Sequence, residues 1–120
     1  MANQKFVDGL RQLGYNIGDV PDNKVTFDYE IKEGRHKGKK IKLGFEVPPD
    51  FEMTPPSGPH LYPRFLPMNP QAPNHPDRVA DSGPFGKDWQ YLSRPFPNWP
   101  GTTRTVGVYM HYVDHLLNTL

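Results

Sequence analysis

The chain has no cysteine, and this absence removes a group of chemistries. Disulfide bonds, thiolate metal sites and thioester intermediates all need a cysteine sulfur, so none of them can form on this chain. The absence fits a reducing compartment, and we expect a cytoplasmic protein.

Long apolar runs and an excess of one charge are also missing. No stretch approaches the roughly 20 apolar residues that cross a bilayer. The N-terminal region holds no apolar core of the length found in signal peptides. Lysine and arginine number 14 against 13 aspartates and glutamates, which gives a formal net charge of +1. Because so small a charge creates no strong field, we expect neither nucleic acid nor a membrane as a partner.

The chain is instead rich in proline and in aromatic side chains. Its 120 residues include 15 prolines, 11 glycines, seven phenylalanines, six tyrosines and two tryptophans. A chain of this length builds one hydrophobic core, and its aromatic content is too high for a solvated tail. We therefore predict a single domain over residues 1–120 with a long irregular section.

The first part of the chain predicts a helix followed by a β-hairpin. Apolar residues recur at helical spacing over residues 4–13, with Leu13 as the last of the apolar stripe and Gly14 as the stop. Residues 25–31 and 39–47 alternate apolar and polar side chains, which is typical of half-buried strands. The glycine-containing loop between them favours an antiparallel hairpin.

The rest of the chain predicts an irregular segment and a second helix. Fourteen of the fifteen prolines lie within residues 48–100, where they exclude helix and limit strand pairing. Only residues 60–66 suit a further strand, which we expect at a sheet edge. Residues 103–120 return to helical periodicity, with Thr102 or Thr103 as the N-cap. The predicted fold is α+β: an N-terminal helix, an antiparallel β-meander, the proline-rich segment and a C-terminal helix.

The proline-rich segment also carries large aromatic side chains that give it something to bury. We expect four of them to belong mainly to the core: Trp89, Tyr91, Phe96 and Trp99. A long loop that is held in place in this way is usually functional.

Three short motifs follow one another in an order that points to a known family. Residues 45–56 run from an apolar strand through Phe51 to a Pro-Pro pair. Residues 74–77 read Asn-His-Pro-Asp, and Trp99 with Pro100 forms a corner before the last helix. In this order and spacing the chain resembles the ubiquitin-conjugating enzyme (E2-like) family, which has a similar Pro-Pro pair, a His-Pro-Asn motif and a tryptophan-proline corner.

The chain departs from that family at the catalytic position. The family's cysteine commonly stands eight residues before the tryptophan, and here that position is Tyr91. The pattern is similar to divergent bacterial relatives that sit beside E1-like and ubiquitin-like proteins, and to cysteine-less eukaryotic variants that bind ubiquitin without carrying it. The resemblance implies a ubiquitin-like protein and its E1-like activating enzyme as partners.

The same resemblance indicates four candidate catalytic residues: His75, Asp77, Ser82 and Ser93. An ionised Asp77 cannot donate the hydrogen bond that the family's asparagine gives to an oxyanion, so it would orient His75 or accept a proton. Ser82 or Ser93 would carry the modifier as an oxyester, with a neighbouring base to activate the hydroxyl, for which His75 or Asp77 is the candidate at Ser82. The alternative is that these four residues have no catalytic role and only form turns and loops. A third interpretation is that Ser82, Ser93 or Ala80 stands in place of a natural cysteine.

The predicted docking groove lies in the proline-rich segment, with five binding residues: Phe51, Pro55, Pro56, Trp89 and Tyr91. A partly exposed Trp89 would anchor the tail of a partner protein.

Two further clusters have simpler explanations. The hairpin tip, residues 32–42, holds six basic side chains opposed only by Glu33. It is either a small electrostatic binding module or a solvated turn. His111 and His115 are four residues apart, a spacing that suits two metal ligands. No third ligand is evident, and a polar helix face explains them, so we expect no metal and no cofactor.

We therefore expect an E2-like component of a bacterial ubiquitin-like conjugation system. In this interpretation it binds the modifier or the activating enzyme without a catalytic cysteine. The alternatives are an active carrier that forms a serine oxyester and a small binding module that uses the basic hairpin.

Overall fold

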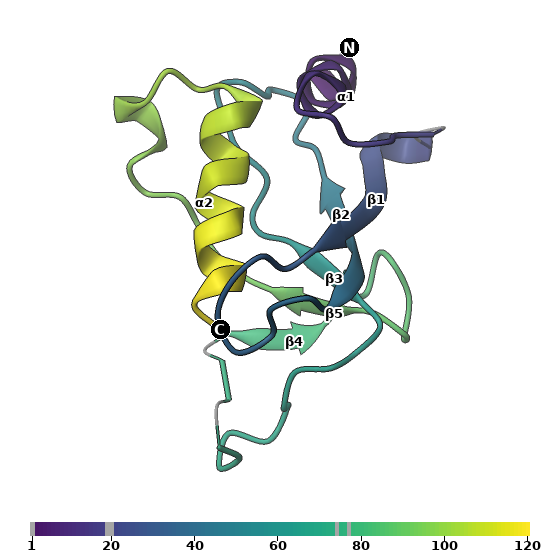
Figure 1. The fold of residues 1–120 in the computed structure, drawn as a ribbon. Helices are drawn as coiled ribbons and strands as arrows, with labels where there is room; N and C mark the ends of the chain where they lie inside the picture. The colour runs from purple at the N-terminus through teal and green to yellow at the C-terminus, as the bar shows by residue number, and fades with distance from the viewer. Residues whose placement is uncertain (1, 19–20, 74, 77) are drawn as a thin grey trace.

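The structure, a computed structural model, describes residues 2–18, 21–73, 75–76 and 78–120. Within these ranges the fold is α+β, with a helix at each end of the chain and a five-stranded antiparallel sheet between them (Figure 1). The elements are α1 (Ala2–Gln12), the 3₁₀ turn η1 (Pro21–Asn23), β1 (Lys24–Glu30), β2 (Lys40–Glu46), β3 (His60–Tyr62), β4 (Val79–Asp81), β5 (Gln90–Leu92), the 3₁₀ turn η2 (Trp99–Gly101) and α2 (Val106–Asn118).

Helix α1 is confirmed, but it ends earlier than its apolar stripe predicts. Phe6 and Leu10 are fully buried. Gly14 stops the helix with a left-handed φ of 97°, which suits a residue without a side chain. Leu13 therefore falls in the closing turn and is 49% exposed, so its assignment to the buried stripe was wrong.

Strands β1 and β2 form the predicted hairpin. Their register runs without interruption from the pair Lys24–Glu46 to the pair Glu30–Lys40. The apolar side chains of both strands are buried on one face, which we call the inner face. The ring of Phe45 on this face meets Phe6 of α1 and Tyr109 of α2. Both helices therefore share the core on the inner face.

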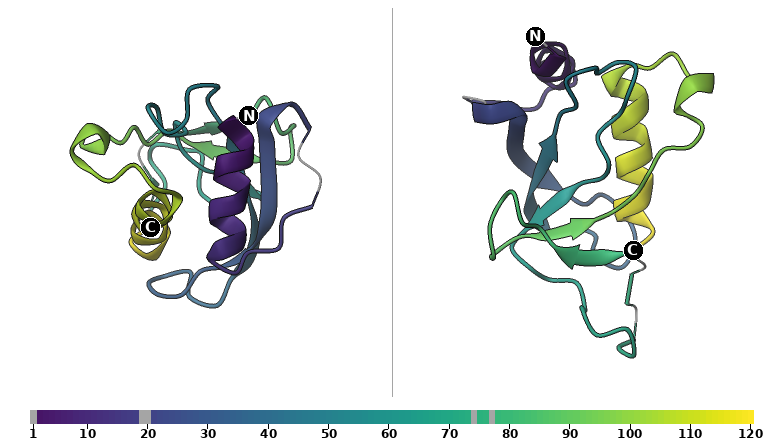
Figure 2. Two further views of the ribbon diagram at one scale, coloured as in Figure 1. Left: turned by 90° about the horizontal axis from the view of Figure 1, so that it is seen from above. Right: turned by 180° about the vertical axis from the view of Figure 1, so that it is seen from behind.

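The strand order is β1-β2-β3-β5-β4, and it corrects two predictions about the proline-rich segment. The strand expected at the sheet edge is β3, which is internal and pairs with β2 and β5. It ends at Tyr62 because Pro63 follows and cannot donate to the ladder. Strands β4 and β5 were not predicted; each has only three residues and lies between prolines. The chain between β3 and β4 leaves the body as a long loop (Figure 2).

Helix α2 buries its predicted apolar face but begins later than expected. The buried side chains are Val106, Tyr109, Met110, Val113 and Leu117. Its N-cap is Thr105, whose hydroxyl accepts the N–H of Val108, so the expected cap at Thr102 or Thr103 was wrong. The reason is Arg104, whose φ of 57° breaks the helical path. No helix among the described residues is both long and apolar enough to span a bilayer.

Of the four aromatic residues expected in the core, only Trp99 is fully there. Its ring packs against Phe51, Phe96 and Tyr109, and its indole N–H donates to the carbonyl of Glu52 at 2.8 Å. Phe96 is half-buried beside it, whereas Trp89 and Tyr91 are half-buried away from the inner face.

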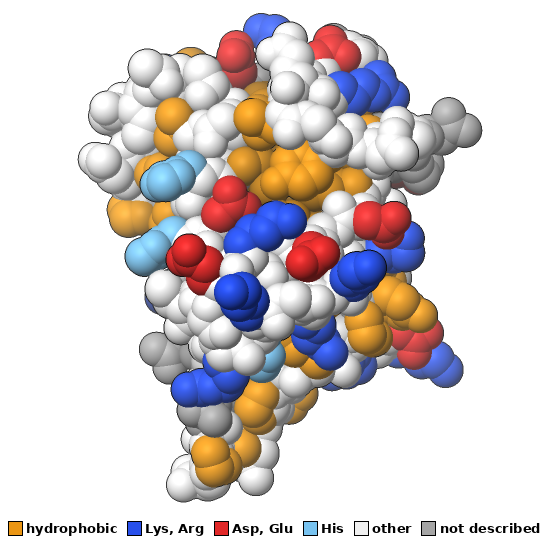
Figure 3. Space-filling view, viewed as in Figure 1, with side chains coloured by type: hydrophobic (Ala, Val, Ile, Leu, Met, Phe, Trp, Pro, Cys, Tyr) orange, Lys and Arg blue, Asp and Glu red, His pale blue; other side chains and the backbone are white. Residues whose placement is uncertain are grey.

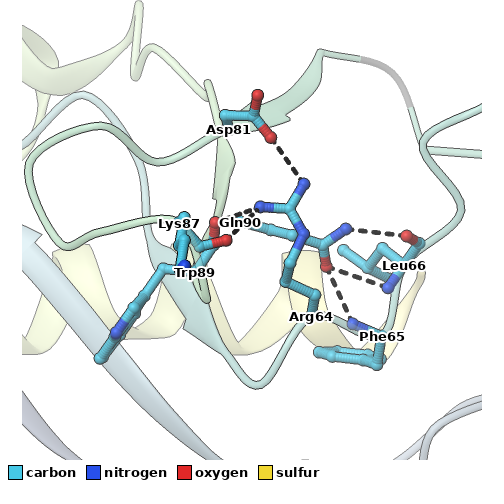
Figure 4. A network of polar contacts seen from close by, with 7 residues as sticks. All are labelled: Arg64, Phe65, Leu66, Asp81, Lys87, Trp89 and Gln90. Atoms are coloured by element: carbon cyan, nitrogen blue, oxygen red, sulfur yellow. Dashed lines mark hydrogen bonds and ion pairs between the residues drawn. The ribbon is translucent and has the colours of Figure 1, made fainter.

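The buried side chain of Gln90 replaces a missing stretch of ladder (Figure 4). Its Oε1 accepts the backbone N–H groups of Phe65 and Leu66, each at 3.0 Å, and its Nε2 donates to the carbonyl of Leu66 at 2.8 Å. Gln90 has no exposed surface, and its two hydrogen bonds to Leu66 are shielded from water. They fix the chain that follows β3.

Arg64 ties the same segment to the loop that precedes β5. Its Nη1 donates to the carbonyls of Lys87 and Trp89 at 2.9 Å, and its Nη2 contacts Asp81 Oδ1 at 2.6 Å (Figure 4). Gln90 and Arg64 together hold three short strands in register.

Replacing Gln90 by leucine should destabilise the fold. The buried N–H and carbonyl of Leu66 and the part-buried N–H of Phe65 would lose their partner, which costs about 2 kcal/mol or more. Urea unfolding followed by circular dichroism measures this loss. Gln71→Leu, an exposed glutamine in the loop after β3, is the control and should unfold like the parent. Equal free energies of unfolding for Gln90→Leu and the parent would contradict this role.

Candidate functional site

The face of the sheet opposite the helices, the outer face, carries an aromatic cluster. The register aligns Gly44 of β2, His60 of β3 and Tyr91 of β5 in one row across the sheet. The loop after β4 folds back over this row and adds Phe85 and Trp89. With Tyr62, these aromatic side chains form what we call the outer-face cluster: His60, Tyr62, Phe85, Trp89 and Tyr91.

The rings of this cluster contact one another in sequence. His60 lies 4.6 Å from Phe85 and 4.5 Å from Tyr91, measured between ring centroids. Trp89 lies 5.1 Å from Phe85 and 5.4 Å from Tyr62. These spacings are those of stacked and tilted aromatic pairs. Tyr62 is partly exposed, so the row of rings runs from the protein surface to a buried histidine.

Gly44 lies directly beneath the loop that follows β4. A Cβ at this position would lie 2.9 Å from the Phe85 ring and 3.1 Å from the Trp89 ring. The absence of a side chain therefore permits the loop to contact the strand directly.

Ser82 sits beneath this loop and is hydrogen-bonded to His60. Its Oγ lies 2.8 Å from His60 Nδ1 and accepts the N–H of Phe85 at 3.2 Å. Burial lowers the pKa of His60 to about 4, so the ring is neutral near pH 7 and Nδ1 can accept the serine proton. The serine thus has a base beside it. Only 4% of Ser82 and 3% of His60 are exposed, however, so the pair is closed to a macromolecular substrate.

Acid should destabilise the fold through His60. The group has a lowered pKa of about 4 when folded and about 6.5 when unfolded, so the unfolded chain binds the proton more readily. The stability is present above about pH 6.5 and is lost as the pH falls toward 4. Urea unfolding at a series of pH values measures this loss.

The variant His60→Gln should show a weaker loss of stability with acid than the parent. His111→Gln, on the exposed side of α2, serves as the control and should keep the parental dependence. An unchanged acid dependence in His60→Gln would assign the loss to other groups.

The structure shows Ser82 hydrogen-bonded to His60, and no hydrogen bond between His75 and Ser82 is found among the described residues. His75 and Pro76 line a cavity of about 310 Å³ with Arg35 and Arg94, beside the C-terminal end of α2. The histidine at Ser82 is His60, from β3. Asp77, the other predicted base, lies outside the described residues.

Three other predicted residues meet in a second place, which we call the proline groove. It is a hollow of about 300 Å³ lined by residues 54–57, Ser93 and residues 95–97. Pro55, Pro56 and Ser93 therefore share one surface. Ser93 is half-buried there, and its backbone N–H donates to the carbonyl of Arg78 at 3.2 Å.

Tyr91 connects the outer-face cluster to the proline groove. Its hydroxyl lies 2.6 Å from Ser57 Oγ, while its ring stacks on His60. Phe51, the remaining predicted binding residue, is buried in the core against Phe6 and Trp99 and does not face the groove.

The groove continues onto the exposed side of α2 through Phe96. Phe96 also lines a neighbouring hollow of about 630 Å³ with Val108, Tyr112 and both helix histidines. Tyr112 ties the two regions by donating to the carbonyl of Pro95 at 2.8 Å. Over the part of the chain that the structure describes, no three histidine or carboxylate side chains are grouped to hold a metal.

Two of the six basic side chains of the hairpin tip contact neighbouring groups. Lys42 contacts Asp28 at 2.9 Å, and Lys39 lies 5.0 Å from the centre of the Phe65 ring. On the face seen in Figure 3, basic side chains are interspersed with acidic ones. Such mixing weakens the electrostatic attraction that a phosphate-binding surface needs.

Comparison with known protein families, with curated proteins and with solved structures finds no match for this chain.

Sequence reasoning missed His60, Phe85 and Gly44. The alternation of His60, Leu61 and Tyr62 contains part of the signal, because it places His60 and Tyr62 on the face opposite Leu61. The partner loop is 22 residues further along, and no local pattern links Ser82 to His60.

Proposed function

We propose that this protein is a cysteine-less E2-like protein of a bacterial ubiquitin-like conjugation system. It acts in the cytoplasm and binds a ubiquitin-like protein, or the activating enzyme of that protein, without a covalent bond. The order of elements supports this proposal: a helix, the antiparallel strands β1, β2 and β3 paired in sequence, the proline-rich segment and the corner at Trp99 that leads into α2. The finer assignment to the ubiquitin-conjugating fold rests on that order and on the motifs.

The sequestration of Ser82 is the observation that favours binding over catalysis. An acceptor serine must reach the activated end of an incoming protein, yet Ser82 is buried and its hydroxyl is engaged by His60 and Phe85. Tyr91, at the position of the family's cysteine, has its hydroxyl on Ser57 and its ring on His60. Ser82 is therefore closed to an incoming protein, and the Tyr91 hydroxyl is already hydrogen-bonded.

The proline groove is the docking surface that fits this function. Its prolines lose little entropy on binding, because their backbone is already restricted. Phe96 and Tyr112 give apolar surface, and Ser93 and Thr54 give hydrogen-bonding groups at the groove. A mostly apolar hollow with a few polar groups is typical of a ligand-binding site, and we propose that the ligand here is a segment of the partner protein.

Ser93 keeps the carrier alternative open for test. It lines the groove and is half-buried, so of the two predicted acceptor serines it is the one with access to a docked modifier. An oxyester on Ser93 would need a base that shares the groove.

A charging assay distinguishes these functions. The protein is mixed with ATP and with a bacterial ubiquitin-like protein and its activating enzyme, and the products are treated with thiol or with mild hydroxide. We expect no covalent adduct while the activating enzyme itself becomes charged. A band that resists thiol, is lost in hydroxide and disappears in Ser93→Ala would replace the binding function with the carrier function.

Reversible binding is measured separately, by calorimetry with the same two proteins. Pro55→Arg, in the groove, should weaken the affinity by about tenfold or more, because it places a charge in an apolar contact. Met68→Arg, on the loop after β3 and outside the groove, is the control and should bind like the parent. No binding of either protein by the folded parent would contradict the proposal.

A further inference from the structure

Strand β1 forms a long open edge of the sheet. Within the described ranges it pairs only with β2, at one end of the strand order (Figure 1). It has seven residues, no proline and a continuous register, whereas β4 at the opposite edge has three residues. An edge of this length and regularity is a template for pairing with another strand.

The backbone groups that face this open edge can be identified from the ladder. At the two ends of β1, the N–H of Ile31 donates to the carbonyl of Lys39, and the carbonyl of Asn23 accepts the N–H of Val47. Bonding toward one neighbour alternates along an antiparallel strand. The odd-numbered residues therefore bond to β2, and the even-numbered ones direct their N–H and C=O groups away from it. These outward residues are Lys24, Thr26, Asp28 and Glu30.

The side chains of the same four residues lie on the outer face in a charge pattern. The order is basic, neutral, acidic, acidic, from Lys24 to Glu30. A strand that pairs with this edge meets these side chains directly opposite its own. The charges therefore select the partner and its register.

We propose that the protein forms a two-fold symmetric dimer in which β1 of one copy pairs antiparallel with β1 of the other. The two sheets then join into one continuous sheet. A two-fold axis through Phe27 makes the interface self-complementary, as a symmetric dimer requires. The proposal is independent of the function proposed above.

The register centred on Phe27 satisfies both the backbone and the charges. It places Lys24 opposite Glu30 of the second copy, and Thr26 opposite Asp28 of the second copy. Each outward residue of one copy then lies opposite an outward residue of the other copy. Every outward N–H therefore meets an outward C=O. Both ends of the interface carry an opposite-charge pair.

Neighbouring registers are worse on the same criteria. A shift by one residue places the outward N–H and C=O groups of one copy opposite residues of the other copy whose N–H and C=O groups already bond to β2. A shift by two residues in one direction sets Asp28 against Asp28 of the second copy, and in the other direction sets Glu30 against Asp22. Like charges directly opposite one another are destabilising.

A charge swap tests the register. Light scattering after size-exclusion chromatography, over a wide range of concentrations, should show a dimer for the parent. Lys24→Glu sets two glutamates opposite each other at both ends of the interface and should weaken the dimer by about tenfold. Adding Glu30→Lys restores opposite charges across the interface and should restore the dimer.

The charge swap distinguishes an effect on the dimer interface from an effect on the stability of one copy. Inside one copy, Lys24 faces Glu46 and Glu30 faces Lys40, and the double variant leaves both of these pairs with like charges. A gain in intramolecular stability therefore cannot explain a restored dimer. A double variant that stays as weak as Lys24→Glu would overturn the register.

Thr26→Pro tests the open edge itself. It removes an N–H that faces away from β2 and leaves the β1–β2 bonds in place, so it should give a folded monomer. Thr26→Val keeps the N–H and should remain a dimer. Hydrogen exchange should show slow amides at Thr26, Asp28 and Glu30 in the parent and fast ones at Asp28 and Glu30 in Thr26→Pro.

Three results would overturn the proposal. One is a parent that is monomeric at every concentration with fast exchange at the edge. Another is a dimer that survives both Thr26→Pro and Lys24→Glu. The third is a monomer whose edge amides become slow only when another protein is added, which would assign the edge to that protein. If Thr26→Pro fails to fold, the charge swap still decides.

Discussion

The supply of backbone hydrogen-bond donors constrains this fold more than any other factor. Fourteen prolines lie in residues 48–100, and each removes an N–H that a sheet would use. The side chains of Gln90, in the interior, and Arg64, at the surface, donate to backbone carbonyls in this region. Gln90 Oε1 also accepts the N–H groups of Phe65 and Leu66, which have no strand partner there. These two side chains hold β3, β5 and β4 together although each strand has only three residues. The outer-face cluster and the proline groove both depend on this arrangement, because their residues come from these strands and the loops beside them.

The outer-face cluster and the proline groove are two ends of one structure rather than separate features. Tyr91 reaches His60 with its ring and Ser57 with its hydroxyl. A change in the buried pair of His60 and Ser82 would therefore shift Tyr91 and its contact with Ser57 at the groove. This connection indicates a structural role for the buried serine and histidine, because they support Tyr91, whose hydroxyl contacts the wall of the groove at Ser57.

Local patterns in the sequence predicted the helices and the hairpin, because periodicities of 3.6 and 2 residues report directly on one buried face. The same patterns did not predict strands or contacts that join residues far apart in the sequence. Three residues are too few to show alternation, so β4 and β5 were missed. The N-cap of α2 was misplaced because the left-handed conformation of Arg104 leaves no trace in residue type. Pro55 and Pro56 were predicted as binding residues and Ser93 as a catalytic candidate, and these roles stay predictions. Their meeting in one hollow is a product of the fold that no local pattern predicts. The partner of Ser82 was not predictable, since burial rather than spacing brings His60 to it.

The position of β5 between β3 and β4 has a consequence for how the chain folds. The hairpin of β1 and β2 closes a short loop and needs nothing from the rest of the chain, so it can form early. Strand β3 can join it only through β2, and its other side stays open until the whole excursion from Tyr62 to Gln90 has returned. Closing this long loop lowers the conformational entropy of the chain before any stabilising contact between β3 and β5 has formed. We therefore expect the hairpin to act as the nucleus and the return of Gln90 to be the late step that commits the chain to its native topology.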